Sequence, residues 1–234
     1  MKHSAPCPPA AAVIVAGGKG VRMGQPVRKQ YLHLNGTPIL NKTLEAFDAC
    51  DVIDCIILVT PETDFTYIRD KILSPCPLKK KIMLAPGGSS RQESVYNGLK
   101  SLDGSQEIVA IHDAVRPFVT CDQIRACIRT AAASGACIPG IPAFDTLKKT
   151  NTSGIIEQTL DRNHIWLAQT PQAFQYHLIL KAHERAKADN FTGTDDASLM
   201  ERLGMPVTMI EGSRFNIKIT TPDDLKLAAA FLRL

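Results

Sequence analysis

The sequence predicts an α/β protein with a mostly parallel sheet, and three observations lead to this prediction. Apolar, strand-like runs recur with helical patterns between them, which is typical of βαβ units. Glycine or charged residues directly follow three of these runs, at the strand ends where such proteins bind ligands. One stretch, 142–170, breaks the alternation. The strands expected in the sheet are Val13–Ala16, Cys55–Thr60, Lys81–Ala85, Ile108–His112 and Ala136–Ile141.

Length and composition fit one globular unit. The 234 residues are 44% hydrophobic and 21% charged, values that argue against a disordered or fibrous protein. We therefore expect a single domain over 1–234 with 142–170 as an appended arm. The net charge of +4 is mild, and the one basic run, Lys79–Lys81, is more typical of a solvated loop than of a nucleic-acid surface. No apolar run approaches the length of a membrane span, so we expect neither a nucleic-acid nor a membrane partner.

The cysteines indicate a reducing compartment. There are seven of them, an odd number, with no C-x-x-C pair and no histidine cluster nearby. This pattern argues against a disulfide framework or a zinc site and favours free thiols in the cytoplasm.

A glycine loop with cations follows the first expected strand. Glycine lets backbone N–H groups approach phosphate oxygens closely, and cations neutralise a polyphosphate. The residue order does not match the P-loop motif. The dinucleotide-binding motif G-x-G-x-x-G is matched at Gly18 and Gly20 but not at its last position, which is Met23. A purely structural turn is the alternative interpretation. The loop residues are Ala16, Gly17, Gly18 and Gly20, and the cations are Arg22, Arg28 and Lys29.

A second glycine turn, Pro86–Gly88, lies between the third expected strand and a helix. The free N–H groups of a helix start beside glycines suit an anion or a base. Ser90 is the expected N-cap of this helix, and Glu93 is expected to complete a capping box.

The third strand-end motif contains Asp113, directly after the run Ile108–His112. An acid at the mouth of a buried strand is costly unless it is hydrogen-bonded or meets a cation. Beside a polyphosphate that cation would be Mg²⁺, which prefers one or two carboxylates and phosphate oxygens. A local salt bridge with Arg116 is the alternative, and His112 is expected to be packed rather than to bind a ligand.

The stretch 142–170 reads as two alternating β segments around a turn at Thr152–Gly154. A hairpin that projects from an α/β body cannot bury both faces alone, so we expect it to pack on a partner. From composition alone, Arg162 would be predicted to be a charged residue exposed to solvent.

The last third is expected to contain two further strands, Val207–Ile210 and Phe215–Thr220, between two helices. Thr194 is the expected N-cap of the first helix, and Thr221 caps the last helix with Pro222 at its first position. Lys218 lies on the opposite side of its strand from its isoleucine neighbours and points either into a cleft or to solvent.

Taken together, these motifs resemble those of the nucleotidyltransferases that join a phosphorylated small molecule to a nucleoside triphosphate, most closely the 2-C-methyl-D-erythritol 4-phosphate cytidylyltransferases of the non-mevalonate isoprenoid pathway. The resemblance covers nearly the whole chain and implies a three-layer, Rossmann-like nucleotidyltransferase fold whose β-arm swaps across a homodimer. One departure is Arg28, where the family usually has proline. The matching motifs are A-G-G-x-G-x-R-M, K-Q-Y, G-G-x-x-R-x-x-S-V, H-D-A-x-R-P, D-T-x-K, D-R-N, T-P-Q, T-D-D-A-S and N-I-K-I-T.

The resemblance also implies site residues. Catalytic roles fall to Arg22, Lys29 and Lys218, and Mg²⁺ binding falls to Asp113. The implied nucleotide-binding residues are Ala16, Gly17, Gly18, Gly20, Gly88, Ser94, Asp113 and Ala114. The implied acceptor-binding residues are Arg116, Thr146, Arg162, Thr194 and Lys218, with Thr146 and Arg162 reaching the neighbouring subunit.

The implied reaction is attack by the phosphate of methylerythritol phosphate on the α-phosphorus of CTP, with release of pyrophosphate. Ribitol 5-phosphate is the alternative acceptor, because its cytidylyltransferases share nearly all these motifs. A non-catalytic nucleotide-binding protein is a third interpretation, and a nicotinamide-dependent oxidoreductase is disfavoured by Met23.

Overall fold

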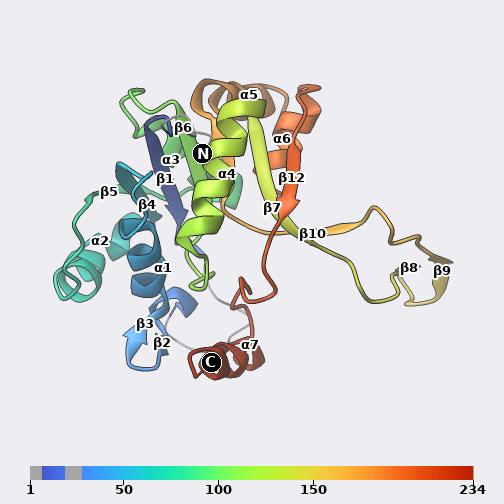
Figure 1. The fold of residues 1–234 in the computed structure, drawn as a ribbon, viewed down its shortest axis with the longest axis horizontal. Helices are drawn as coiled ribbons and strands as arrows, with labels where there is room; N and C mark the ends of the chain where they lie inside the picture. Colours follow the sequence, from blue (N-terminus) through green and yellow to red (C-terminus); the bar gives the residue numbers. More distant parts are fainter. Residues whose placement is uncertain (1–6, 19–27, 234) are drawn as a thin grey trace, which may run out of the picture.

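The computed structural model describes residues 7–18 and 28–233, and within these the chain forms a largely parallel sheet covered by helices on both faces (Figure 1). The strands follow the order β10-β7-β11-β6-β1-β4-β5, with β12 beside β7. Strands β1, β4, β5 and β6 are mutually parallel, while β10 and β11 run antiparallel to their neighbours. The prediction of an α/β fold is confirmed. The strands are β1 (Ala10–Val15), β4 (Cys55–Thr60), β5 (Lys81–Pro86), β6 (Ile108–Asp113), β7 (Ala136–Pro142), β10 (Trp166–Ala168), β11 (Gln172–Gln175) and β12 (Thr208–Glu211).

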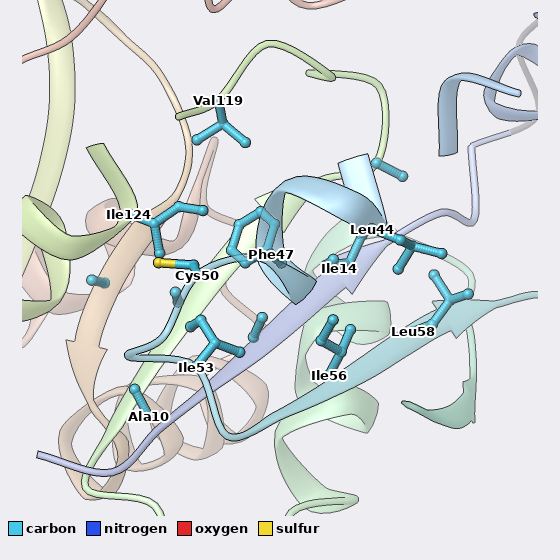
Figure 2. Packing of buried hydrophobic residues seen from close by; sticks show 14 of the residues in the cluster. Ala10, Ile14, Leu44, Phe47, Cys50, Ile53, Ile56, Leu58, Val119 and Ile124 are labelled. Atoms are coloured by element: carbon cyan, nitrogen blue, oxygen red, sulfur yellow. The ribbon is translucent and has the colours of Figure 1, made fainter. Parts of the chain in front are cut away.

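Two hydrophobic clusters divide the helices into two layers. Along β1, Ala10, Ala12 and Ile14 face one cluster with α1 and α4, and Ala11 and Val13 face the other with α3, α5 and α6. Figure 2 shows the first cluster packed against the sheet. Because both faces are covered, the central strands are apolar throughout. The helices are α1 (Ile39–Asp48), α2 (Phe65–Tyr67), α3 (Arg91–Lys100), α4 (Cys121–Ser134), α5 (Tyr176–Ala188), α6 (Asp196–Arg202) and α7 (Pro222–Phe231). None of the helices in the described part of the chain is long and apolar enough to cross a membrane.

A short 3₁₀ turn, Lys29–Tyr31, places Lys29 near the end of β1. The side-chain amide of Gln30 donates to the carbonyl of Ala16 at 2.5 Å. Arg28 pairs with Asp64 at 2.8 Å, and the hydroxyl of Tyr31 donates to the same carboxylate. These contacts fix the entry to the turn. The small hairpin β2 (His33–Leu34) and β3 (Thr37–Pro38) follows, and a π-helical turn, Ile68–Leu73, continues α2.

The arm extends away from the body of the molecule (Figure 1). Its tip is the hairpin of β8 (Lys148–Thr150) and β9 (Ile156–Thr159), which forms the predicted turn. Gly154 has a φ of +80°, a conformation that favours glycine. The returning strand β10 pairs with β7 in the main sheet, so the root of the arm is built into the body.

Four local predictions need correction. The segment 215–220 is not a strand, because Ile219 instead packs into a small cluster with Val115 and α7 and its amide donates to the carbonyl of Val115 at 2.9 Å. The N-cap before α6 is Asp195, whose side chain accepts from Ser198, and not Thr194. Ser90 caps α3 as predicted, but Glu93 accepts from Ser89 and does not complete a capping box.

The fourth correction concerns strand ends. β1 begins at Ala10, earlier than the β-branched run that predicted it, and β12 is shifted by one residue from Val207–Ile210. Alanine has a weak strand preference, so the pattern hid the first half of β1. The cap of α7 is confirmed, with a full capping box between Thr221 and Asp224.

Candidate active site

A pocket of about 440 Å³ opens at the carboxyl ends of β1, β5 and β6. This is the edge where parallel sheets bind ligands, and all three strand-end motifs of the sequence meet there. The described lining residues are Val15, Ala16, Gly17, Gly18, Lys29, Gln30, Gly88, Ser89, Ser90, Arg91, Ser94, Asp113, Ala114, Val115 and Lys218.

The glycine loop forms one wall of the pocket. The amide of Ala16 donates to the carbonyl of Val59 at 2.7 Å, which continues the strand pairing to the edge of the loop. A Cβ built on Gly18 would lie 3.8 Å from Cε of Lys29, so the lysine side chain runs close over this loop. Gly20 and Arg22, both predicted site residues, lie outside the described residues.

The second glycine turn is held by the start of α3. The amide of Gly88 donates to Oγ of Ser94 at 3.0 Å, and the Ser94 hydroxyl donates to the carbonyl of Ser90 at 2.8 Å. A Cβ on Gly88 would overlap the Glu93 side chain, so this position needs glycine. The turn and the first residues of a ten-residue helix thus face the glycine loop across the pocket.

Asp113 is the centre of charge in the pocket. Its carboxylate is buried and lies 2.8 Å from Nζ of Lys218, 3.3 Å from Nε of Arg91 and 3.7 Å from Nε of Arg116. Burial alone would raise the pKa of this carboxyl, but the charges of Arg91, Lys218 and Arg116 outweigh burial and hold the pKa well below its usual range. The salt bridge between Asp113 and Arg116 that the sequence left as an alternative is present, together with two further cations.

Arg91 is a charged residue of this site that the sequence motifs did not single out. Its Nη1 lies 2.7 Å from Oδ2 of Asp196, and its Nε faces Asp113. Asp196 is 1% exposed and its other oxygen lies 3.2 Å from Nε2 of His183. The sequence contains Arg91 and Asp196 in two of the matching motifs, but 105 positions separate them and no local pattern joins them.

Asp113 also decides whether the site suits Mg²⁺. It is the one carboxylate among the described lining residues, and Mg²⁺ is commonly bound by one or two carboxylates with water and substrate phosphates. The donor set therefore fits a magnesium ion that binds together with a triphosphate. Nζ of Lys218 lies 2.8 Å from Oδ2 of the same carboxylate.

The structure does not bring every predicted residue into the pocket. Arg116 lies behind Asp113, where its Nη1 donates to the carbonyl of Asn216 at 2.7 Å. Thr146 and Arg162 are exposed on the arm, and Arg162 donates to the carbonyl of Phe144. Thr194 is exposed beside α6. His112 is buried between Thr170 and Arg116, as the sequence predicted.

The ion pair between Arg91 and Asp196 predicts a stability effect. Asp196→Asn keeps the shape of the side chain but leaves Arg91 with one carboxylate partner, so we expect the free energy of unfolding to fall by about 3 kcal/mol. Chemical denaturation measures this value. Asp189→Asn is the matched control, since Asp189 pairs with two arginines at the surface and its loss should change little. Equal losses in both variants would contradict a special role for the buried pair.

Comparison with known proteins shows which family this chain is similar to. A family model for 2-C-methyl-D-erythritol 4-phosphate cytidylyltransferase matches residues 10–234. A curated protein of that name from Syntrophus aciditrophicus is 50% identical over 97% of each chain, and one from Geotalea uraniireducens is 46% identical over 95% of this chain and 96% of its own. A 4-diphosphocytidyl-2C-methyl-D-erythritol synthase from Anaerococcus prevotii has a similar crystal structure, with a TM-score of 0.86 at 33% identity over 97% of both chains. The Thermus thermophilus cytidylyltransferase gives a TM-score of 0.80 at 30% identity, covering 97% of this chain and all of its own.

Proposed function

The chain belongs to the 2-C-methyl-D-erythritol 4-phosphate cytidylyltransferase family, and on this basis we propose that it transfers CMP from CTP to 2-C-methyl-D-erythritol 4-phosphate. The products are pyrophosphate and 4-diphosphocytidyl-2-C-methyl-D-erythritol. The observation that carries this function is a pocket in which two glycine turns and the cations Lys29, Arg91 and Lys218 surround Asp113, the one acid among the lining residues that the structure describes.

The chemistry explains why the pocket is rich in cations and needs no general base. A phosphate monoester has a second pKa of about 6, so the attacking group is already largely ionised at neutral pH. The main obstacle is repulsion between the attacking phosphate and the triphosphate. Catalysis then consists of positioning and of charge stabilisation.

Lys29 is proposed to stabilise the crowded α-phosphate and the departing pyrophosphate, with Arg22 in the same role. Lys218, which also lines the pocket, is proposed to orient the attacking phosphate and the triphosphate. The glycine loop after β1 is proposed to donate backbone N–H groups to the phosphates, and the second glycine turn, with Gly88 and Ser94, lies on the nucleoside side. Arg116 and Thr194 belong to the acceptor side.

Asp113 is proposed to hold Mg²⁺ during the reaction. When bound, the ion supplies positive charge to the phosphate oxygens. Arg91 and Arg116 keep the Asp113 carboxylate ionised and in place before substrates bind.

A homodimer formed through the arm is also proposed. The arm exposes large apolar side chains, and a two-stranded hairpin of this kind has little stability by itself. Thr146 and Arg162 lie outside the pocket of their own chain, so we propose that they act in the pocket of the neighbouring subunit. The exposed apolar residues of the arm are Phe144, Ile155, Ile156, Trp166 and Leu167.

Mixing two inactive variants tests this assignment. Lys29→Ala damages a subunit's own pocket, whereas Arg162→Ala damages the contribution of its arm. If the arm acts across the interface, an exchanged equal mixture should recover about one quarter of wild-type activity, because half the dimers contain one intact site. No recovery in a mixture that sedimentation shows to be dimeric would place Arg162 in its own subunit's site. A monomer with full activity would also contradict the proposal.

A reducing compartment such as the cytoplasm is proposed for this chain. All seven cysteines are free thiols, which is consistent with that environment.

Pyrophosphate release in the presence of CTP and Mg²⁺ tests the function. We expect turnover with 2-C-methyl-D-erythritol 4-phosphate and much less with ribitol 5-phosphate. Turnover with ribitol 5-phosphate alone would move the protein to polyol phosphate metabolism with the same mechanism. Folded protein that binds CTP but turns over neither acceptor would be a binding protein.

A further inference from the structure

Two thiols outside the pocket lie nearly at bonding distance. Sγ of Cys50, just after α1, is 2.9 Å from Sγ of Cys121, the first residue of α4. A disulfide needs a separation of about 2.05 Å, so less than about 1 Å of movement would join them. Figure 2 shows Cys50 in the first hydrophobic cluster with Phe47 and Ile124.

The two thiols have different surroundings. Cys50 is fully buried, and burial is the main reason that its pKa is raised to about 12. Cys121 is only partly buried and lies in the first turn of a fourteen-residue helix, where Nη2 of Arg125 is 3.3 Å from its sulfur. A helix N-terminus and a neighbouring guanidinium are typical surroundings of reactive cysteines.

We propose that Cys121 and Cys50 are an oxidisable pair that a hydroperoxide converts into a disulfide. The Cys121 thiol releases its proton to solvent, its thiolate attacks the terminal peroxide oxygen and the O–O bond breaks. Cys121 becomes a sulfenic acid, and the departing alkoxide or hydroxide takes up a proton from solvent and leaves as an alcohol or water. The Cys50 sulfur then attacks the Cys121 sulfur, the S–O bond breaks, and the hydroxide that leaves takes the Cys50 proton as water. Two thiols are oxidised in total, and one hydroperoxide is reduced.

The cross-link would join the end of α1 to the start of α4. It closes a loop of about 70 residues, a length at which a disulfide strongly restricts the unfolded chain. The loop between β6 and α4 ends at this point, but neither cysteine lines the pocket. The oxidised protein should therefore unfold at a higher temperature and retain its activity.

A metal site is the competing interpretation. The carboxylate of Asp51 lies with the two sulfurs in a group compact enough to hold an ion. However, Arg125 already binds this group, with its Nη2 2.8 Å from Oδ1 of Asp51 and 3.3 Å from Sγ of Cys121. A guanidinium inside the ligand set opposes a second cation, and no triphosphate is proposed to bind here and supply negative charge as it does beside Asp113, so the geometry favours thiol chemistry.

The chain offers an internal comparison in Cys127 and Cys137, whose thiols also interact but are both fully buried. A hydroperoxide cannot reach this pair without opening of the core. Cys7 is partly exposed and is not paired with another thiol, so Cys7→Ser is a control variant.

The test is treatment of reduced, folded protein with hydrogen peroxide, followed by blocking of free thiols and peptide mapping without reductant. We expect one cross-linked peptide pair, containing Cys50 and Cys121, loss of two of the seven free thiols, and a Tm several degrees higher that dithiothreitol reverses. Cys7→Ser should behave like wild type, and Cys121→Ser should show neither the cross-link nor the Tm shift.

The wild-type mapping needs no variant, so a Cys121→Ser protein that fails to fold would not affect the result. Oxidation of Cys121 to sulfinic or sulfonic acid without a cross-link would overturn the proposal, as would a cross-link between Cys127 and Cys137 instead. Protection of both thiols by a metal that a chelator removes would identify the group as a metal site.

Discussion

Replacing Lys29 by alanine is expected to lower kcat by about 10³-fold while CTP affinity changes by less than about tenfold. Lys29 lies on the pocket wall beside the glycine loop, where the triphosphate is proposed to bind. The negative charge on that group is most concentrated as the new bond forms and pyrophosphate leaves, so a cation placed there contributes more to the transition state than to the bound substrate. Steady-state kinetics gives kcat, and calorimetric titration of CTP gives the affinity.

Two further variants test whether the position of the Lys29 charge matters, or only the presence of a positive charge on the protein. Lys29→Arg keeps the charge but not its position, and should recover only part of the loss. Lys79→Ala removes a lysine from a loop away from the pocket and should leave both quantities unchanged. Equal losses of kcat and of CTP affinity in Lys29→Ala would show that Lys29 serves ground-state binding alone.

The central sheet could be predicted because its strands are apolar on both faces. Apolar runs such as Cys55–Thr60 and Ile108–His112 are typical of strands buried in a parallel sheet, and the motifs that follow them fall at the same edge by the rules of such sheets. The sheet rules alone leave Lys218 open between a cleft and solvent; only the resemblance to the cytidylyltransferases places it in one site with Asp113, more than a hundred positions away.

The contacts among charged side chains could not be predicted in the same way. Arg91 resembles any arginine at a helix start until the fold brings Asp196 against it, and Asp196 resembles a residue of a helix cap. The segment 215–220 alternates like a strand, but its alternation reflects packing of Ile219 against a loop and a helix. Period-two patterns report which residues are buried and not what they are buried against.

Asp113→Asn is expected to lower kcat/KM by about 10²- to 10³-fold and to weaken the dependence of activity on Mg²⁺. The change is nearly isosteric, so the pocket keeps its shape while Arg91, Arg116 and Lys218 lose their shared counter-charge. The amide offers a divalent cation one neutral oxygen in place of a carboxylate. Activity measured over a range of Mg²⁺ concentrations at fixed CTP gives the half-saturating metal concentration, which should rise.

The pH dependence of stability separates the charge of Asp113 from its metal role, because it is measured without Mg²⁺. The pKa of the folded carboxyl is lowered, so Asp113 contributes stability that is fully present above the unfolded value of about 3.9 and is lost as the pH falls toward the folded pKa. The difference in unfolding free energy between wild type and Asp113→Asn should therefore be constant above about pH 5 and shrink below about pH 4. A difference that persists at low pH would mean that the carboxylate is not stabilised by the three cations. An unchanged Mg²⁺ titration would instead remove Asp113 from the metal site while leaving its ion pairs intact.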